Sequence, residues 1–93
     1  MRFDPTQLSV LAYANGFTHW HYRSADPLHG ILAPAYFSAA AEMLRPGDQI
    51  TVNLLEGNTI GLAHCVVTGI SDADPRIALV GASAMPEALR RAA

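Results

Sequence analysis

The sequence predicts one small, mainly β domain with a single short helix, built as an antiparallel sheet or a partly closed β-barrel. Three observations predict this class. The chain has 93 residues, the length of one domain. Alternating, β-branched and aromatic segments recur between turns that contain Gly, Pro and Asn. Glycines within the strands favour a curled sheet over a flat one. The whole chain, 1–93, is therefore expected to form one domain, with 82–93 as a surface tail.

The first element is expected to be a β-hairpin. The apolar stretch 8–14 ends at Asn15-Gly16, a turn signal because both residues tolerate positive φ. The next stretch, 17–23, is rich in aromatic residues, which is typical of a strand. Alternation divides its side chains between two faces, with Thr18, Trp20 and Tyr22 on one and Phe17, His19 and His21 on the other. One set must face outward or toward a neighbouring subunit, and the sequence leaves both choices open.

A short helix is expected over 35–44, after a loop over 24–34. Its apolar residues recur at the helical spacing i, i+3, i+4, i+7: Phe37, Ala40, Ala41 and Leu44. Pro46 ends the helix, because the residue before a proline avoids the helical region. Pro46-Gly47 supplies the centre of a type II turn, in which Gly47 needs positive φ. The Asp48 carboxylate is then expected to accept backbone N–H groups and to fix the corner between helix and strand.

Three strands are expected to follow as a meander. The first begins at Gln49 and alternates apolar and polar residues to Leu54. The second runs over 59–70, with a bend at Gly61 or Gly69. The third is short, over 76–80, and the segment after it is a tail or a frayed helix over 86–92.

The composition favours a protein that associates with neighbours. Hydrophobic residues make up 51% of the chain and charged residues 15%. A domain of this size buries a modest fraction of its unfolded surface, so this is more apolar material than one compact core hides. The surplus is expected to meet other subunits in a homo-oligomer.

The charge pattern argues against nucleic-acid and membrane partners. The formal net charge is −2, and the six basic residues are all arginines, scattered apart from Arg90-Arg91. They form no basic stripe that could neutralise a run of phosphates. No apolar stretch approaches the ~20 residues that a membrane-spanning helix needs. The sequence also lacks the charged-then-apolar layout of a signal peptide at its start.

No pattern in the sequence is typical of a catalytic or cofactor site. Cys65 is the lone cysteine, so no disulfide forms within the chain. Its neighbour His64 would point to the opposite face of a strand, which prevents a thiolate–imidazole couple. Asp72 and Asp74 fit a turn before Pro75. The chain is predicted not to be an enzyme and to bind no cofactor.

Three histidines leave one alternative open. His19 and His21 share a strand face, and pairing with the strand of His64 would bring three imidazoles together, as in a zinc site. The H-x-H spacing is common by chance, and no carboxylate or second cysteine completes a ligand set. The preferred interpretation is surface or interface histidines without a metal. The candidate interface residues themselves are aromatic: Phe17, Trp20, Tyr22, Tyr36 and Phe37.

Two segments carry a resemblance to a known group of proteins. They are Asn15-Gly16-Phe17-Thr18-His19-Trp20-His21-Tyr22-Arg23 and the run from Ala35-Tyr36-Phe37 through Leu44, Gly47-Asp48 and Val52, together about a third of the chain. They resemble segments of short virion proteins of tailed bacteriophages, of the head decoration (cement) or head-fibre base type. In that group a glycine usually stands where this chain has Ala35, a departure that a helix would tolerate.

The resemblance implies a structural virion protein that binds the outer capsid surface and stabilises the shell through subunit contacts. Its implied partners are the major capsid protein and sister copies in a homotrimer, and its implied location is the capsid surface after synthesis in the host cytoplasm. The group offers no catalytic residues. Two alternatives remain: a tail- or fibre-anchoring virion module, and a small metal- or ligand-binding host domain that uses His19, His21 and His64.

Overall fold

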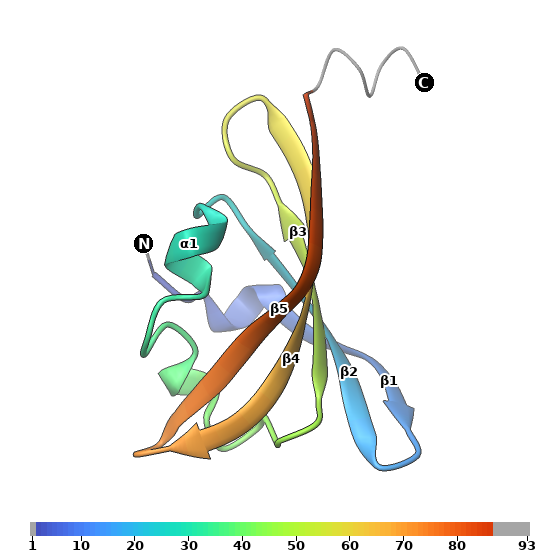
Figure 1. Cartoon of the computed structure of the whole chain (residues 1–93), viewed down its shortest axis with the longest axis vertical. Helices are drawn as coiled ribbons and strands as arrows, with labels where there is room; N and C mark the ends of the chain where they lie inside the picture. Colours follow the sequence, from blue (N-terminus) through green and yellow to red (C-terminus); the bar gives the residue numbers. More distant parts are fainter. Residues whose placement is uncertain (1, 87–93) are drawn as a thin grey trace.

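The computed structural model describes residues 2–86, with residues 59 and 83–86 as backbone only. The elements follow one another as a 3-10 turn η1 (Pro5–Gln7), strands β1 (Leu8–Ala14) and β2 (Phe17–Ser24), helix α1 (Leu28–Ile31), a 3-10 turn η2 (Ser38–Ala40), and strands β3 (Gln49–Leu54), β4 (Thr59–Ser71) and β5 (Asp74–Pro86) (Figure 1). Within these residues the protein is mainly β with one short α-helix, which confirms the predicted class.

The five strands form one open sheet in the order β1-β2-β3-β4-β5. Three neighbouring pairs are antiparallel, but β2 and β3 run parallel, with His19 opposite Gln49 and Tyr22 opposite Val52. The sheet is therefore mixed, where an antiparallel sheet or a partly closed barrel was expected. The reason is the connection over residues 25–48: a parallel pair needs a crossover of about a dozen residues or more, and this segment supplies it.

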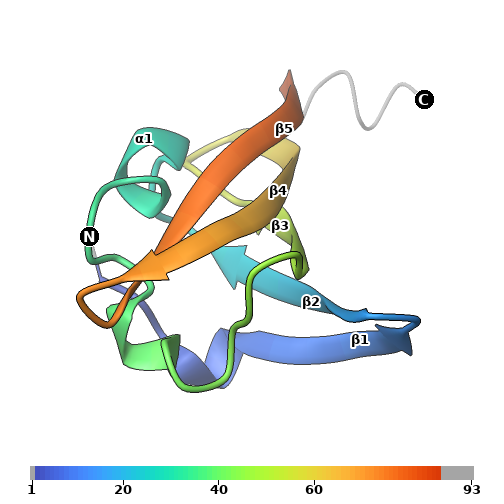
Figure 2. The ribbon, with the colours of Figure 1, turned by 60° about the horizontal axis from the view of Figure 1, so that its bottom comes forward.

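The crossover covers one face of the sheet and encloses the core (Figure 2). From the sheet, the core takes seven buried side chains: Trp20, Tyr22, Ile50, Val52, Ala63, Cys65 and Val67. From the crossover and the N-terminal segment it takes five: Phe3, Ile31, Phe37, Ala40 and Leu44. The strand face of Trp20 and Tyr22 is thus the inner one, and the face of Phe17, His19 and His21 is the outer one.

The helix expected over 35–44 is not formed. The segment makes turns and the 3-10 element η2 instead, with bonds such as Ala40 N–H to the Phe37 carbonyl at 2.9 Å. Ala35 has a φ of +68°, which a right-handed helix does not allow. The idea that a helix tolerates alanine in place of glycine at this site is therefore wrong, because the backbone is left-handed here. The apolar spacing still identified the buried residues correctly, since Phe37, Ala40 and Leu44 all lie in the core.

All three hairpin turns use positive φ, in different ways, and in the β3–β4 turn the residue is Gly57, at +58°. In the β1–β2 turn Gly16 has a φ of +93°, whereas Asn15 has no positive φ. In the β4–β5 turn both central residues are left-handed, Asp72 at +53° and Ala73 at +59°, the pattern of a type I′ turn.

The β4–β5 hairpin is longer than the sequence indicated. Each strand has 13 residues, and residues 82–86 belong to β5, where a surface tail was expected. Residues 87–93, the rest of the predicted tail or frayed helix, lie outside the described residues. The pairing shifts register between His64 and Cys65 and again between Val67 and Gly69, so one of the two irregularities lies at Gly69, whereas Gly61 is paired regularly with Ala84.

Candidate functional site

The aromatic residues proposed for an interface are divided between core and surface. Trp20, Tyr22 and Phe37 are buried within the chain, and Tyr36 is half-buried against them. Of the five, Phe17 lies on the outer face of β2, half-buried. Phe3, which no pattern in the sequence pointed to, stacks on Tyr22 with ring centroids 5.3 Å apart. Its signal was weak, because one aromatic residue before Pro5 has no periodic pattern around it.

The hydroxyl groups of this aromatic cluster tie the N-terminal segment to the end of β2. Asp4 donates its backbone N–H to the Tyr22 hydroxyl at 2.9 Å, and that hydroxyl bonds Tyr36 at 2.8 Å. Tyr36 in turn donates to Asp26 Oδ2 at 2.8 Å. The bond from Tyr36 lowers the pKa of the Asp26 carboxyl, while burial raises the pKa of the Tyr36 hydroxyl. Asp26 is therefore a carboxylate and Tyr36 a neutral donor, an arrangement that fixes structure.

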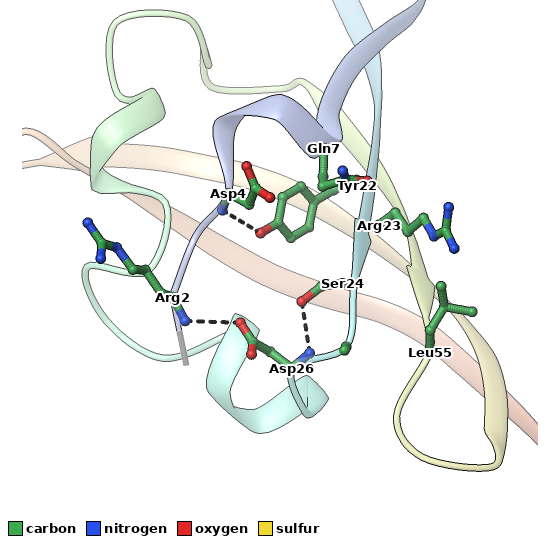
Figure 3. A pocket seen from close by; sticks show the side chains of 9 residues that line it. Arg2, Asp4, Gln7, Tyr22, Arg23, Ser24, Asp26 and Leu55 are labelled. Atoms are coloured by element: carbon green, nitrogen blue, oxygen red, sulfur yellow. Dashed lines mark hydrogen bonds between the residues drawn. The ribbon is translucent and has the colours of Figure 1, made fainter.

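A cavity of about 500 Å³ opens beside this network (Figure 3). Its lining is Arg2, Asp4, Gln7, Tyr22, Arg23, Ser24, Ala25, Asp26 and Leu55. Figure 3 shows that the side chains of Arg2 and Arg23 point away from each other, so they do not form one anion site. The Ser24 hydroxyl accepts the Asp26 N–H at 2.9 Å, and no histidine is among the lining residues to activate it. The cavity does not assemble a nucleophile with a base.

Asp48 holds the corner before β3, as the sequence predicted. Its side chain is only 2% exposed. One oxygen accepts the Thr18 N–H at 2.9 Å, and the other accepts the Trp20 indole N–H at 3.0 Å and the Arg45 N–H at 3.1 Å. The preceding type II turn is also confirmed, because Gly47 has a φ of +95° and Asp48 N–H bonds the Arg45 carbonyl. The sequence did not reveal that Asp48 joins this corner to β2, since the two segments are far apart in the chain.

His19 and His64 lie on the outer face of the sheet and belong to one hydrogen-bonded chain, whereas His21, on the same face, is not part of it. His19 Nε2 is 2.7 Å from Thr51 Oγ1, which is 3.3 Å from His64 Nδ1, and His64 Nε2 is 3.1 Å from Gln49 Oε1. An amide oxygen only accepts, so His64 Nε2 donates to Gln49. Both ring nitrogens of His64 therefore have hydrogen-bond partners within the sheet. Among residues 2–86, no group of three or more His, Cys, Asp or Glu side chains is placed to hold a metal ion.

Cys65 faces the core, away from this histidine chain. Its side chain is buried, and burial raises the pKa of the thiol to about 11. A thiol of that pKa stays protonated near neutral pH and is a poor nucleophile.

In the part of the chain that the structure describes, the two edges of the sheet have backbone groups without a partner strand, unlike the hydrogen-bonded polar side chains described above. Within residues 2–86 no strand pairs with the outer edge of β1 or of β5. The middle of each edge strand carries exposed apolar side chains: Val10, Leu11 and Tyr13 on β1, and Leu79 and Val80 on β5. Tyr13 is 82% exposed, Val80 68% and Leu11 55%. The sequence of β1 contains no charged residue, and β5 contains none after Arg76.

Such edges are unusual, because natural proteins protect them with charges, prolines or short strands. The register shift beside Leu11 and the one beside Val80 are the protective irregularities on these two strands. The residues most available for contact are therefore edge residues, above all Tyr13 and Val80, and neither is among the five aromatic candidates that the sequence suggested. The signal that could have found them was the absence of charge in both strands.

No helix among the described residues is both long and apolar enough to span a bilayer. No protein-family model, curated protein or solved structure matches this chain.

Proposed function

We propose that this protein is structural and works by being built into a larger assembly through the open edges of its sheet. The observation that carries the proposal is the pair of edge segments without charge, 8–14 and 77–86, which expose the apolar residues Leu11 and Tyr13 on β1 and Val80 on β5. An open edge offers unpaired N–H and C=O groups as well as apolar contacts, the two components of strand addition. The polar groups of the interior, by contrast, are used to hold the fold.

The assembly that we propose is the outer surface of a tailed-bacteriophage capsid, with the protein as a decoration or cement protein. The support is the resemblance of 15–23 and 35–52 to such proteins. These two segments lie side by side, because β2 pairs with β3 and Asp48 bonds both Thr18 and Trp20. The residues on which the proposal rests thus form one connected unit of the fold.

The physical role follows from many weak contacts. A decoration protein adds contacts across capsomer boundaries and so resists the internal pressure of packaged DNA. Each copy contributes a modest interface, and clustering in a homotrimer multiplies the effect through avidity. The major capsid protein is the proposed partner, and the proposed site of action is the surface of the virion.

Cryo-electron microscopy of particles with and without the gene tests this function. We expect density of about this size on the outer head surface, absent from particles of the deletion strain and restored by adding the purified protein. Deletion particles should also release DNA at lower temperature, which a DNA-binding dye reports. Density at the tail or a fibre would instead support an anchoring module, and no density on the particle would contradict the proposal.

A further inference from the structure

We infer that the partner of each open edge is a second copy of this chain, with the β5 edge of one copy paired to the β1 edge of the next. This inference deepens the proposed function by naming what covers the edges, and it rests on the role of the protein as an assembly component. The contact is head-to-tail, because the two surfaces that meet belong to different parts of the chain.

The topology gives the direction of this pairing. Along the sheet, β1 is antiparallel to β2, and β2 is parallel to β3. Strand β4 is antiparallel to β3, and β5 is antiparallel to β4. The two edge strands therefore run in opposite directions. A second copy placed beside the first with its core face on the same side brings its β1 antiparallel to β5. Antiparallel pairing is slightly more stable per residue than parallel pairing.

The charges and apolar groups of the two edges fit each other. Residues 8–14 carry no charge, and residues 77–86 carry none, so that no like charges meet across the contact. The apolar residues also coincide in position, because Leu11 is the middle of β1 and Val80 is the middle of β5. Tyr13 pairs with Thr18 and Leu79 pairs with Cys65, so both lie on the inner face of the sheet. A register that keeps the two inner faces on the same side can therefore set Tyr13 opposite Leu79, with Leu11 and Val80, the residues at the two register shifts, close to this pair.

Head-to-tail pairing accounts for both edges at once. A twofold contact of β5 with β5 would cover Val80 and leave the exposed side chains of β1 in water. The same is true in reverse for a twofold contact through β1. In a closed ring of copies, head-to-tail contacts cover the β1 edge and the β5 edge of every copy. A ring of three copies is the homotrimer of the proposed function.

A mixing experiment separates these arrangements. Leu11→Lys blocks the β1 edge and Val80→Lys blocks the β5 edge, since lysine is a residue that protects natural edges. We expect the parent chain to sediment as a trimer and each variant to be a monomer, with association weakened at least tenfold. An equimolar mixture should form a dimer and stop there, because the mixture offers one intact β5 edge and one intact β1 edge per pair.

Leu62→Lys is the matched control, since Leu62 is an exposed leucine on β4, away from both edges. We expect it to keep the parent size. Folding of each variant is checked by the thiol of Cys65, which reacts with a thiol reagent only when the core opens. Tyr13→Lys and Leu79→Lys repeat the test if a first variant does not fold.

Three results would overturn the inference: a monomeric parent chain at all concentrations, a Leu11→Lys variant of parent size, or a mixture that stays monomeric. Its failure differs from failure of the proposed function. A monomer that still binds capsids leaves the decoration role standing, whereas a trimer that binds no particle leaves the edge pairing standing.

Discussion

The corner around Asp48 and the β4–β5 hairpin are stabilised by different means. At the corner, a buried carboxylate accepts three N–H groups from β2 and from the end of the crossover. The hairpin has 13 residues per strand and is held mainly by its backbone ladder, with Ile70, Leu79 and Val80 exposed along it. The difference shows that a buried polar side chain fixes the corner, whereas apolar residues along the hairpin stay exposed and are not needed for the core.

The largest expected effect is at the corner. Asp48→Ala removes the acceptor of three buried or half-buried donors, and we expect it to lower the free energy of unfolding by about 3–5 kcal/mol. Urea denaturation followed by tryptophan fluorescence measures this loss. Glu42→Ala, which removes an exposed carboxylate from the same crossover, should change stability by less than about 0.5 kcal/mol. Equal losses for both variants would mean that the corner is not the anchor.

The second effect tests the turn that presents Asp48. Gly47 has a φ of +95°, and a Cβ placed there meets no atom within 4 Å, so substitution strains the backbone without a steric clash. We expect Gly47→Val to cost about 1–3 kcal/mol in the same denaturation experiment. Gly69→Val is the control, because Gly69 has no positive φ and equal space. A Gly47→Val variant as stable as the parent would contradict the type II turn.

A gain is expected in the hairpin turn. Ala73 has a φ of +59°, where alanine costs about 1–2 kcal/mol and glycine does not. Glycine also makes the unfolded chain more flexible, which offsets about 0.5–1 kcal/mol. Ala73→Gly should therefore stabilise by about 0.5–1 kcal/mol, or a few degrees in Tm. Ala35→Gly should act in the same direction at the crossover, whereas Ala78→Gly within β5 should destabilise.

The smallest effect is a dependence on acid. The hydrogen bond from Tyr36 lowers the pKa of Asp26 in the folded state, so folding favours the carboxylate. This contribution is fully present above the unfolded pKa, near 3.9, and is lost as the pH falls through the lower folded pKa. Tyr36→Phe removes the bond and should flatten the fall in Tm between about pH 5 and pH 3. An unchanged pH profile in this variant would show that the bond does not set the pKa.

The sequence was most informative where the signal is local. Four strands were predicted nearly to the residue, from the alternation of apolar and polar residues and from turn residues such as Asn15-Gly16 and Pro46-Gly47. Asp48 was also given its correct structural role. The parallel contact of β2 with β3 was missed, since alternation does not say which strands pair. The crossover was predicted to be an α-helix because the spacing of Phe37, Ala40 and Leu44 fits an α-helix as well as a series of 3-10 turns. The left-handed backbone at Ala35, which rules out a regular helix there, is not visible in that spacing.

The candidate site was harder to predict for a related reason. A strand with Trp and Tyr can face the core or a partner, and the decision depends on which side the crossover covers. The position of the crossover belongs to the tertiary structure and is not visible in the sequence of the strand. The edge residues Leu11 and Val80 became visible as candidates only when β1 and β5 were found at the two ends of the sheet.

The parallel pairing of β2 with β3 also has a consequence for the order in which the chain folds. Strands β3, β4 and β5 follow one another through short turns, so their contacts close small loops quickly. Strand β2 must wait for the whole of 25–48 to be ordered, and closing that longer loop carries a larger entropic barrier. We therefore expect the N-terminal hairpin, although it is synthesised first, to dock after β3, β4 and β5 have paired, with its tryptophan in water until then.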